Sequence, residues 1–208
     1  MKRILVTGSG GIGGVNFVRA LKIFQDEFFI VGTDFNKYYL QFADLDQRVI
    51  SPKHSDPNFI SLLNKLTEQH KIEFLHPQPS SEALVVSQNL DKISSKTLLP
   101  SSNIISNDKL ETQKILSTSG IAVAKTKTID NYDLIASAFD ELGGGPLWIR
   151  AKNGAGGNLS LLCDNPSEAE YWMKLWILRK KANFDDFMIQ QYLPKRNIAW
   201  DSFWYNGK

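Results

Sequence analysis

A cation followed by a glycine-rich turn is the arrangement in this chain best suited to holding an anion. Arg150 lies near the end of an apolar run at residues 146–151, and Gly154, Gly156 and Gly157 follow shortly after it. A strand would fix the direction of the Arg150 side chain. Glycines let backbone N–H groups approach an anion that a Cβ-bearing loop would hold off. The combination predicts a clamp for a nucleotide triphosphate.

A second glycine-rich turn, at residues 7–14, predicts a different ligand. Gly8, Gly10 and Gly13 match the pattern G-x-G-x-x-G, and Asp34 ends the next apolar run, where an acid that binds a ribose would lie. This pattern favours the dinucleotide site of an extended short-chain oxidoreductase or epimerase. Such enzymes act through a Tyr-x-x-x-Lys pair, and no tyrosine here has a lysine four residues later. A purely structural turn also remains open.

Strands that alternate with helices must position the second of these turns. Strands are expected at 3–7, 28–33, 48–51, 73–76 and 96–99, and helices at 12–24, 57–70 and 81–93. We expect Asp56 to cap the helix at 57–70, and Ser80 or Ser81 to cap the next. The alternation predicts a parallel sheet covered on both faces.

The pattern changes at residue 107, which predicts a second domain at 107–208 after a first at 1–106. Helices are expected at 108–119, 131–142 and 167–181, and strands at 125–129, 147–151, 159–163 and 187–191. Two strands joined by a turn and flanked by helices indicate an α+β layer. The predicted fold class is therefore α/β, with a Rossmann-like parallel sheet followed by an α+β domain.

Composition excludes several classes of partner. The 208 residues are 42% hydrophobic and 22% charged, with a net charge of +2, which is typical of a soluble globular protein and too weak a field to favour nucleic acid. No apolar run approaches the roughly 20 residues of a membrane span, and the amino terminus has no signal-peptide pattern. Cys163 is the single cysteine, which suits a reducing compartment. We expect a cytoplasmic protein.

Three segments, in order, resemble motifs of the ATP-grasp superfamily. Residues 107–126 resemble its opening helical segment, 146–157 its strand and phosphate loop, and 188–194 the hinge that holds adenine. Residues 1–106 resemble the pre-ATP-grasp domain that precedes these motifs, and the whole is most similar to proteins like the large subunit of carbamoyl phosphate synthase. The resemblance covers nearly the whole chain.

The resemblance implies a role for each matched residue. Lys109 and Arg150 would reach the phosphates of ATP, and the turn after Arg150 would be a flap that donates N–H groups. The expected flap residues are Gly154, Ala155, Gly156 and Gly157. The residues expected along the adenine and ribose are Gln190, Gln191, Tyr192, Leu193 and Asn197. The family often has Glu where this chain has Gln190 and Gln191, and a later ribose-binding Glu where it has Asn197.

The implied function is an ATP-dependent carboxylate–amine or related ligase that acts through an acylphosphate. Its cofactors would be ATP and Mg²⁺, and its substrates a small carboxylate and an amine, with a homodimer formed through the first domain. The family's magnesium ligands would lie beyond Lys208, so we expect a fragment with no metal site of its own that is inactive alone. Alternatives are the NAD(P)-dependent oxidoreductase above and a non-catalytic nucleotide-binding module.

Residues of the first domain are weaker candidates for the substrate side of this site. They are Gly8, Gly10, Gly11 and Glu82. Glu82 follows the strand at 73–76, and doubly wound sheets bind ligands at the carboxyl ends of their strands. Its alternative role is that of an acid in the first turn of a helix.

Overall fold

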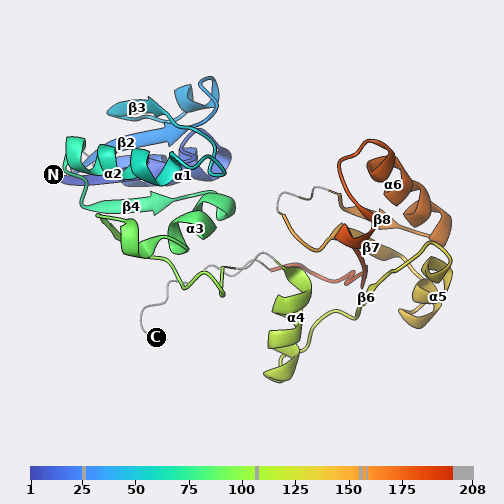
Figure 1. Cartoon of the computed structure of the whole chain (residues 1–208). Helices are drawn as coiled ribbons and strands as arrows, with labels where there is room; N and C mark the ends of the chain where they lie inside the picture. Colours follow the sequence, from blue (N-terminus) through green and yellow to red (C-terminus); the bar gives the residue numbers. More distant parts are fainter. Residues whose placement is uncertain (25–26, 106–107, 155–156, 158, 199–208) are drawn as a thin grey trace. The chain divides into compact units, whose positions relative to one another are not determined.

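The computed structural model describes residues 1–24, 27–105, 108–154, 157 and 159–198. The chain divides into two compact units, Met1–Ser106 and Asn107–Lys208 (Figure 1). The expected flap residues Ala155 and Gly156 lie outside the described residues.

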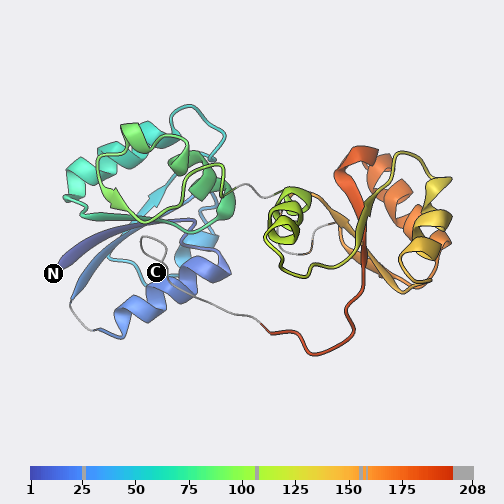
Figure 2. The same cartoon turned by 90° about the horizontal axis from the view of Figure 1, so that it is seen from below.

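The first unit is built on a five-stranded parallel sheet with the strand order β3-β2-β1-β4-β5. The strands are β1 (Lys2–Thr7), β2 (Phe28–Asp34), β3 (Gln47–Ile50), β4 (Phe74–Pro77) and β5 (Lys96–Thr97). Helix α1 (Ile12–Lys22) covers one face, and α2 (Phe59–His70) and α3 (Ser80–Ser87) cover the other (Figure 2). The central strand β1 is apolar because both of its faces are buried: Leu5 packs toward α2 and α3, and Val6 toward α1.

The second unit is built on a four-stranded antiparallel sheet with the order β6-β9-β7-β8. The strands are β6 (Thr126–Thr128), β7 (Leu147–Ala151), β8 (Leu161–Cys163) and β9 (Phe187–Gln191). The helices are α4 (Lys109–Thr118), α5 (Leu134–Glu141) and α6 (Pro166–Leu178). Residues of α5 and α6 pack with Ile149 and Ile189 in one core. The predicted fold class is confirmed.

Alternation along β7 divides its side chains between two environments. Leu147, Ile149 and Ala151 are buried, whereas Trp148 and Arg150 are half-buried. Successive side chains of a strand point to opposite faces of the sheet, so Trp148 and Arg150 face away from the core that contains Ile149. Gln190 is the partner of Trp148 in the antiparallel register, which places it on the same face. The sheet thus gathers polar side chains from β7 and β9 opposite the helices.

Several helix ends differ from expectation. Helix α2 begins at Phe59, and Asp56 accepts the N–H of Asn58 in a turn before the helix, so Asp56 does not cap it. The expected helix at 81–93 ends at Ser87, and a short 3-10 turn (Leu90–Lys92) follows it. Neither Ser80 nor Ser81 caps it, because α3 begins at Ser80 after Pro79. A local hydrogen bond of Asp or Asn to its own backbone competes with helix propagation.

No helix in the described part of the chain is long and apolar enough to cross a membrane.

Candidate functional site

Arg150 lies on β7 with its guanidinium held from one side. Its Nη1 donates to Oε1 of Gln190 on β9 at 3.1 Å. Its Nε is buried and has no hydrogen-bond partner among the described residues. An unpaired buried donor costs about 1–3 kcal/mol.

A cavity of about 310 Å³ lies beside Arg150. Six of the residues predicted to bind a nucleotide line it: Arg150, Gln190, Gln191, Tyr192, Leu193 and Asn197. The structure therefore brings together a strand residue and a hinge segment that lie about 40 positions apart in the chain. Ala124 and Trp148 also line the cavity, and sequence reasoning missed them. Period-2 alternation could have found Trp148, two residues before Arg150 on the same face.

Lys109 is placed at the turn that follows β7. Its Nζ donates to the carbonyl of Gly154 at 2.8 Å and to that of Lys152 at 3.3 Å. Asp108 caps α4 by accepting the N–H groups of Leu110 and Glu111, and this cap fixes where the helix starts. The structure thus joins Lys109 to the predicted glycine turn.

The two cations influence each other. Burial lowers the pKa of Lys109, the charge of Arg150 lowers it further, and Asp108 opposes this shift. The ion pairs found among the described residues involve Lys22, Lys127 and Lys174, and neither Lys109 nor Arg150 takes part in them. Two cations that raise each other's electrostatic energy in this way favour an anionic ligand.

The glycine turn after β7 needs glycine for its backbone. Gly154 has φ of 93° and Gly157 has φ of 72°, in the left-handed region that favours glycine. An added Cβ at either position would meet no atom of the described residues within 4 Å, chain neighbours aside. The space beside both residues is therefore open.

The first glycine loop, in contrast, is filled by the protein itself. A Cβ on Gly8 would lie 2.2 Å from Cγ of Pro79, and one on Gly10 would lie 2.3 Å from the carbonyl carbon of Tyr39. Gly11 has ordinary space, with its nearest contact at 3.5 Å. These glycines allow the segments after β2 and β4 to pack against the loop, which is the structural role left open above.

Asp34 is hydrogen-bonded to the same loop. Its side chain is 4% exposed. One carboxylate oxygen accepts the N–H of Gly10 at 3.1 Å, and the other accepts the N–H of Asn36 at 2.8 Å. The dinucleotide alternative assigns Asp34 to a ribose. In the structure, both of its carboxylate oxygens already accept backbone N–H groups of its own domain.

Glu82 lies in the first turn of α3, close to Gly8. A Cβ on Gly8 would be 3.7 Å from its Oε2, and the residue is 4% exposed. Burial raises the pKa of Glu82 to about 6, the nearby Thr7 hydroxyl lowers it in part, and Asp34 adds to the rise. The hydroxyl of Thr33 has no hydrogen-bond partner among the described residues. A buried polar cluster at the carboxyl ends of β1 and β2 results.

We expect this carboxyl group to make the stability of the protein depend on pH. Its pKa rises from an ordinary 4.5 to about 6 on folding, so the folded chain binds the proton more tightly. The free energy of unfolding should therefore fall, by about 2 kcal/mol in total, as the pH rises from well below 4.5 to well above 6. In the Glu82→Gln variant, the free energy of unfolding should not show this decrease with rising pH. Urea unfolding at a series of pH values measures it. Glu68→Gln, at an exposed position of α2, is the control. A parallel pH dependence in wild type and Glu82→Gln would contradict the prediction.

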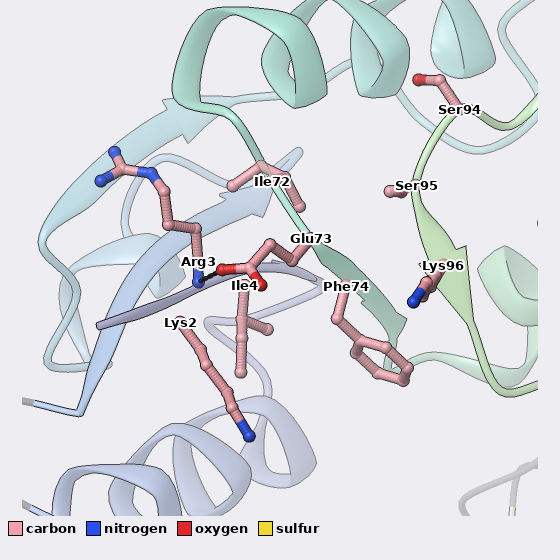
Figure 3. Close-up of a pocket in the computed structure, with 9 residues that line it drawn as sticks. All are labelled: Lys2, Arg3, Ile4, Ile72, Glu73, Phe74, Ser94, Ser95 and Lys96. Atoms are coloured by element: carbon pink, nitrogen blue, oxygen red, sulfur yellow. Dashed lines mark hydrogen bonds between the residues drawn. The ribbon is translucent and has the colours of Figure 1, made fainter.

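A separate hollow of about 510 Å³ lies at the amino ends of β1, β4 and β5 (Figure 3). Its lining includes Lys2, Ile4, Phe74 and Lys96. No motif in the sequence predicted it. In a parallel sheet this end is opposite the carboxyl ends that carry Gly8 and Glu82, so the hollow is not part of the candidate sites.

The part of the chain that the structure describes holds no group of three or more His, Cys, Asp or Glu residues placed to hold a metal ion. The residues beside Lys109 and Arg150 therefore do not fit Mg²⁺ by themselves, because this ion needs several oxygen ligands.

Comparison with solved structures identifies the fold. No family model matches the chain, and no curated protein matches it. N5-carboxyaminoimidazole synthetase from Staphylococcus aureus complexed with ADP matches 92% of this chain and 48% of its own, with a TM-score of 0.66 at 17% identity. The biotin carboxylase domain of 2-oxoglutarate carboxylase from Hydrogenobacter thermophilus, a dimer with MgADP, ADP and bicarbonate, matches 93% of this chain and 44% of its own, with a TM-score of 0.64 at 17% identity.

A third match is carboxyaminoimidazole ribonucleotide synthase from Aspergillus clavatus complexed with ATP. It covers 93% of this chain and 47% of its own, with a TM-score of 0.65 at 14% identity. The chain thus spans less than half the length of these solved structures. Biotin carboxylase and the carboxyaminoimidazole synthetases are ATP-grasp enzymes. Over nearly its whole length, the chain shares the fold of these solved structures, which is the fold that the resemblance to the ATP-grasp superfamily implied.

Proposed function

We propose that the cavity beside β7 and β9 binds ATP, and that the chain supplies the nucleotide-binding part of an ATP-dependent carboxylate–amine or related ligase. The observation that carries the proposal is that Arg150 lines a cavity together with the predicted hinge and acts electrostatically on Lys109, and that neither cation has an ion-pair partner among the described residues. A role in binding a polyanionic ligand explains this arrangement better than a role in an ion pair within the protein does.

Lys109 and Arg150 would hold the phosphates. Arg150 offers a planar fork of donors, and its partner Gln190 is neutral. Lys109 is anchored on the Gly154 carbonyl, so it can follow the glycine turn when N–H groups there approach an anion. When bound, ATP supplies the phosphoryl group that activates a carboxylate as an acylphosphate.

The base would lie along the end of β9. This strand ends at Gln191, so the backbone of Tyr192 and Leu193 leaves the sheet while still lining the cavity. Trp148 and Tyr192 meet edge to face, with ring centroids 6.3 Å apart, and Leu193 is 55% exposed. Apolar rings beside free backbone groups suit a flat heterocycle with a polar edge. Asn197 would hydrogen-bond the ribose.

Glu82 and the loop that contains Gly8, Gly10 and Gly11 are proposed for the substrate side. Glu82, Thr7 and Thr33 have side-chain oxygens near the carboxyl end of a parallel sheet, where α/β folds bind ligands. A carboxyl group and two hydroxyls suit the amine of a substrate. Among the matched enzymes, one complex contains bicarbonate and another contains 5-aminoimidazole ribonucleotide. Small carboxylate and amine substrates, and a homodimer, therefore belong to the proposal.

Complete ligase activity is proposed only for a protein that also supplies magnesium ligands, which the described residues do not provide. The dinucleotide alternative is less well supported, because Asp34 and the space around Gly10 are already occupied by the protein.

ATP binding is the direct test. Trp148 lines the cavity, so we expect ATP to change the tryptophan fluorescence of the chain with saturation, and isothermal titration calorimetry to confirm one site. NAD and NADP at the same concentrations serve as the comparison. Saturable binding of NAD without binding of ATP would reject the proposal and favour the oxidoreductase. ATP binding without ADP release, in a protein that includes magnesium ligands and is supplied with carboxylates, would favour the non-catalytic module.

A further inference from the structure

Gln190 stands at the centre of a hydrogen-bonded chain between two strands and Arg150. The Thr126 hydroxyl donates to the carbonyl of Ala124 at 3.1 Å. Nε2 of Gln190 donates to Oγ1 of Thr126 at 3.1 Å. Oε1 of Gln190 accepts from Nη1 of Arg150 at 3.1 Å.

The direction of donation along these three hydrogen bonds fixes the orientation of the Gln190 amide. A hydroxyl has one proton, and Thr126 gives that proton to Ala124. Its oxygen can then only accept, so the NH₂ group of Gln190 must face Thr126 and the carbonyl must face Arg150. A carboxylate at position 190 has no proton to give to Thr126. Both ends of the buried Gln190 side chain, which is 7% exposed, are thereby used inside the protein.

The partner that holds Arg150 is therefore neutral. Lys109 is likewise held by backbone carbonyls. Asp108 acts on Lys109 in the opposite sense to Arg150, but burial and Arg150 prevail, and the pKa of Lys109 is lowered. An arginine held by an amide keeps its charge, whereas one held by a carboxylate is largely neutralised. The site thus combines a fixed guanidinium, held by a neutral partner, with a positive potential that still lowers the pKa of Lys109.

We propose that Gln190 is a positioning residue that aims Arg150 at the cavity without neutralising it, so that the site selects ligands by the charge of their phosphate chain. Recognition of the base then falls to the other residues of the cavity. This inference rests on the proposed function, because the polyphosphate it concerns is that of ATP.

Gln190→Glu tests the claim with almost no change of shape. We expect its affinity for inorganic tripolyphosphate and for ATP to fall at least tenfold, because a carboxylate would pair with Arg150, while its affinity for adenosine stays within twofold of wild type. Gln190→Met removes the hydrogen bonds without adding charge, and should lower tripolyphosphate affinity by a smaller factor. Gln88→Glu adds the same charge at an exposed position of the first unit and should bind all three ligands as wild type does. Thermal unfolding of each variant confirms that it is folded.

A readout without ligand separates this inference from the proposed function. The pKa of Lys109, measured by NMR on reductively ¹³C-methylated protein, should rise in Gln190→Glu and stay unchanged in Gln190→Met and Gln88→Glu. If wild type binds neither ATP nor tripolyphosphate, the proposed function fails and the selection of ligands by charge fails with it. If wild type binds them, but Gln190→Glu binds them equally well or leaves the pKa of Lys109 unmoved, this inference alone is overturned.

Discussion

Replacing Arg150 with methionine is expected to weaken ATP binding about 100-fold, because hydrogen bonds to charged groups contribute about 1.5–3 kcal/mol and every 1.4 kcal/mol is a factor of ten. Arg150 lines the cavity, and its guanidinium is held there by the neutral Gln190. Methionine keeps much of the apolar length and removes the charge. Isothermal titration calorimetry with ATP measures the effect.

Two further variants make this result specific. Arg150→Lys keeps the charge but loses the fork of donors, so its loss should be smaller, about tenfold. Arg179→Met removes an exposed arginine at the end of α6 and should leave ATP affinity unchanged. The assignment of Arg150 to the phosphates would be untenable if Arg150→Met, shown to be folded, bound ATP as tightly as wild type.

Gly10→Ala should destabilise the first unit by roughly 3 kcal/mol, at the upper end of the usual range for overpacked positions. Its Cβ would lie 2.3 Å from the carbonyl carbon and 2.5 Å from the carbonyl oxygen of Tyr39, and 2.7 Å from the backbone nitrogen of Leu40. These are all backbone atoms, which cannot turn aside as a flexible side chain can. Urea unfolding followed by circular dichroism measures the change.

Gly11→Ala is the matched control in the same loop. Its φ of −72° suits alanine, and the nearest atom to the new Cβ, the carbonyl oxygen of Gly8, would be 3.5 Å away. We expect a change within about 0.5 kcal/mol. Equal effects of the two substitutions would contradict the packing explanation. A stable Gly10→Ala protein that had lost NAD binding would instead revive the dinucleotide alternative.

The sequence by itself determined the fold class and much of the second sheet. The strands expected at 147–151 and 187–191 have those bounds in the structure, and Asp108 caps α4 within the segment expected as a helix. These features depend on local signals: alternation of apolar residues, a capping side chain and glycine at helix ends. Where a local hydrogen bond competed with the helix, as at Asp56, the expected boundary was wrong.

Only the tertiary structure decided how the two glycine loops differ. Both patterns in the sequence are equally rich in glycine, but the loop at residues 7–14 is packed against Tyr39 and Pro79, whereas Gly154 and Gly157 face open space. The sequence predicts that Gln190 contacts adenine, and that prediction is untested. The structure shows both ends of its amide bound to Thr126 and Arg150, and we therefore propose a role in positioning Arg150 instead. The partners come from strands far apart in the chain. Their pairing depends on how those strands assemble, and no local pattern encodes it.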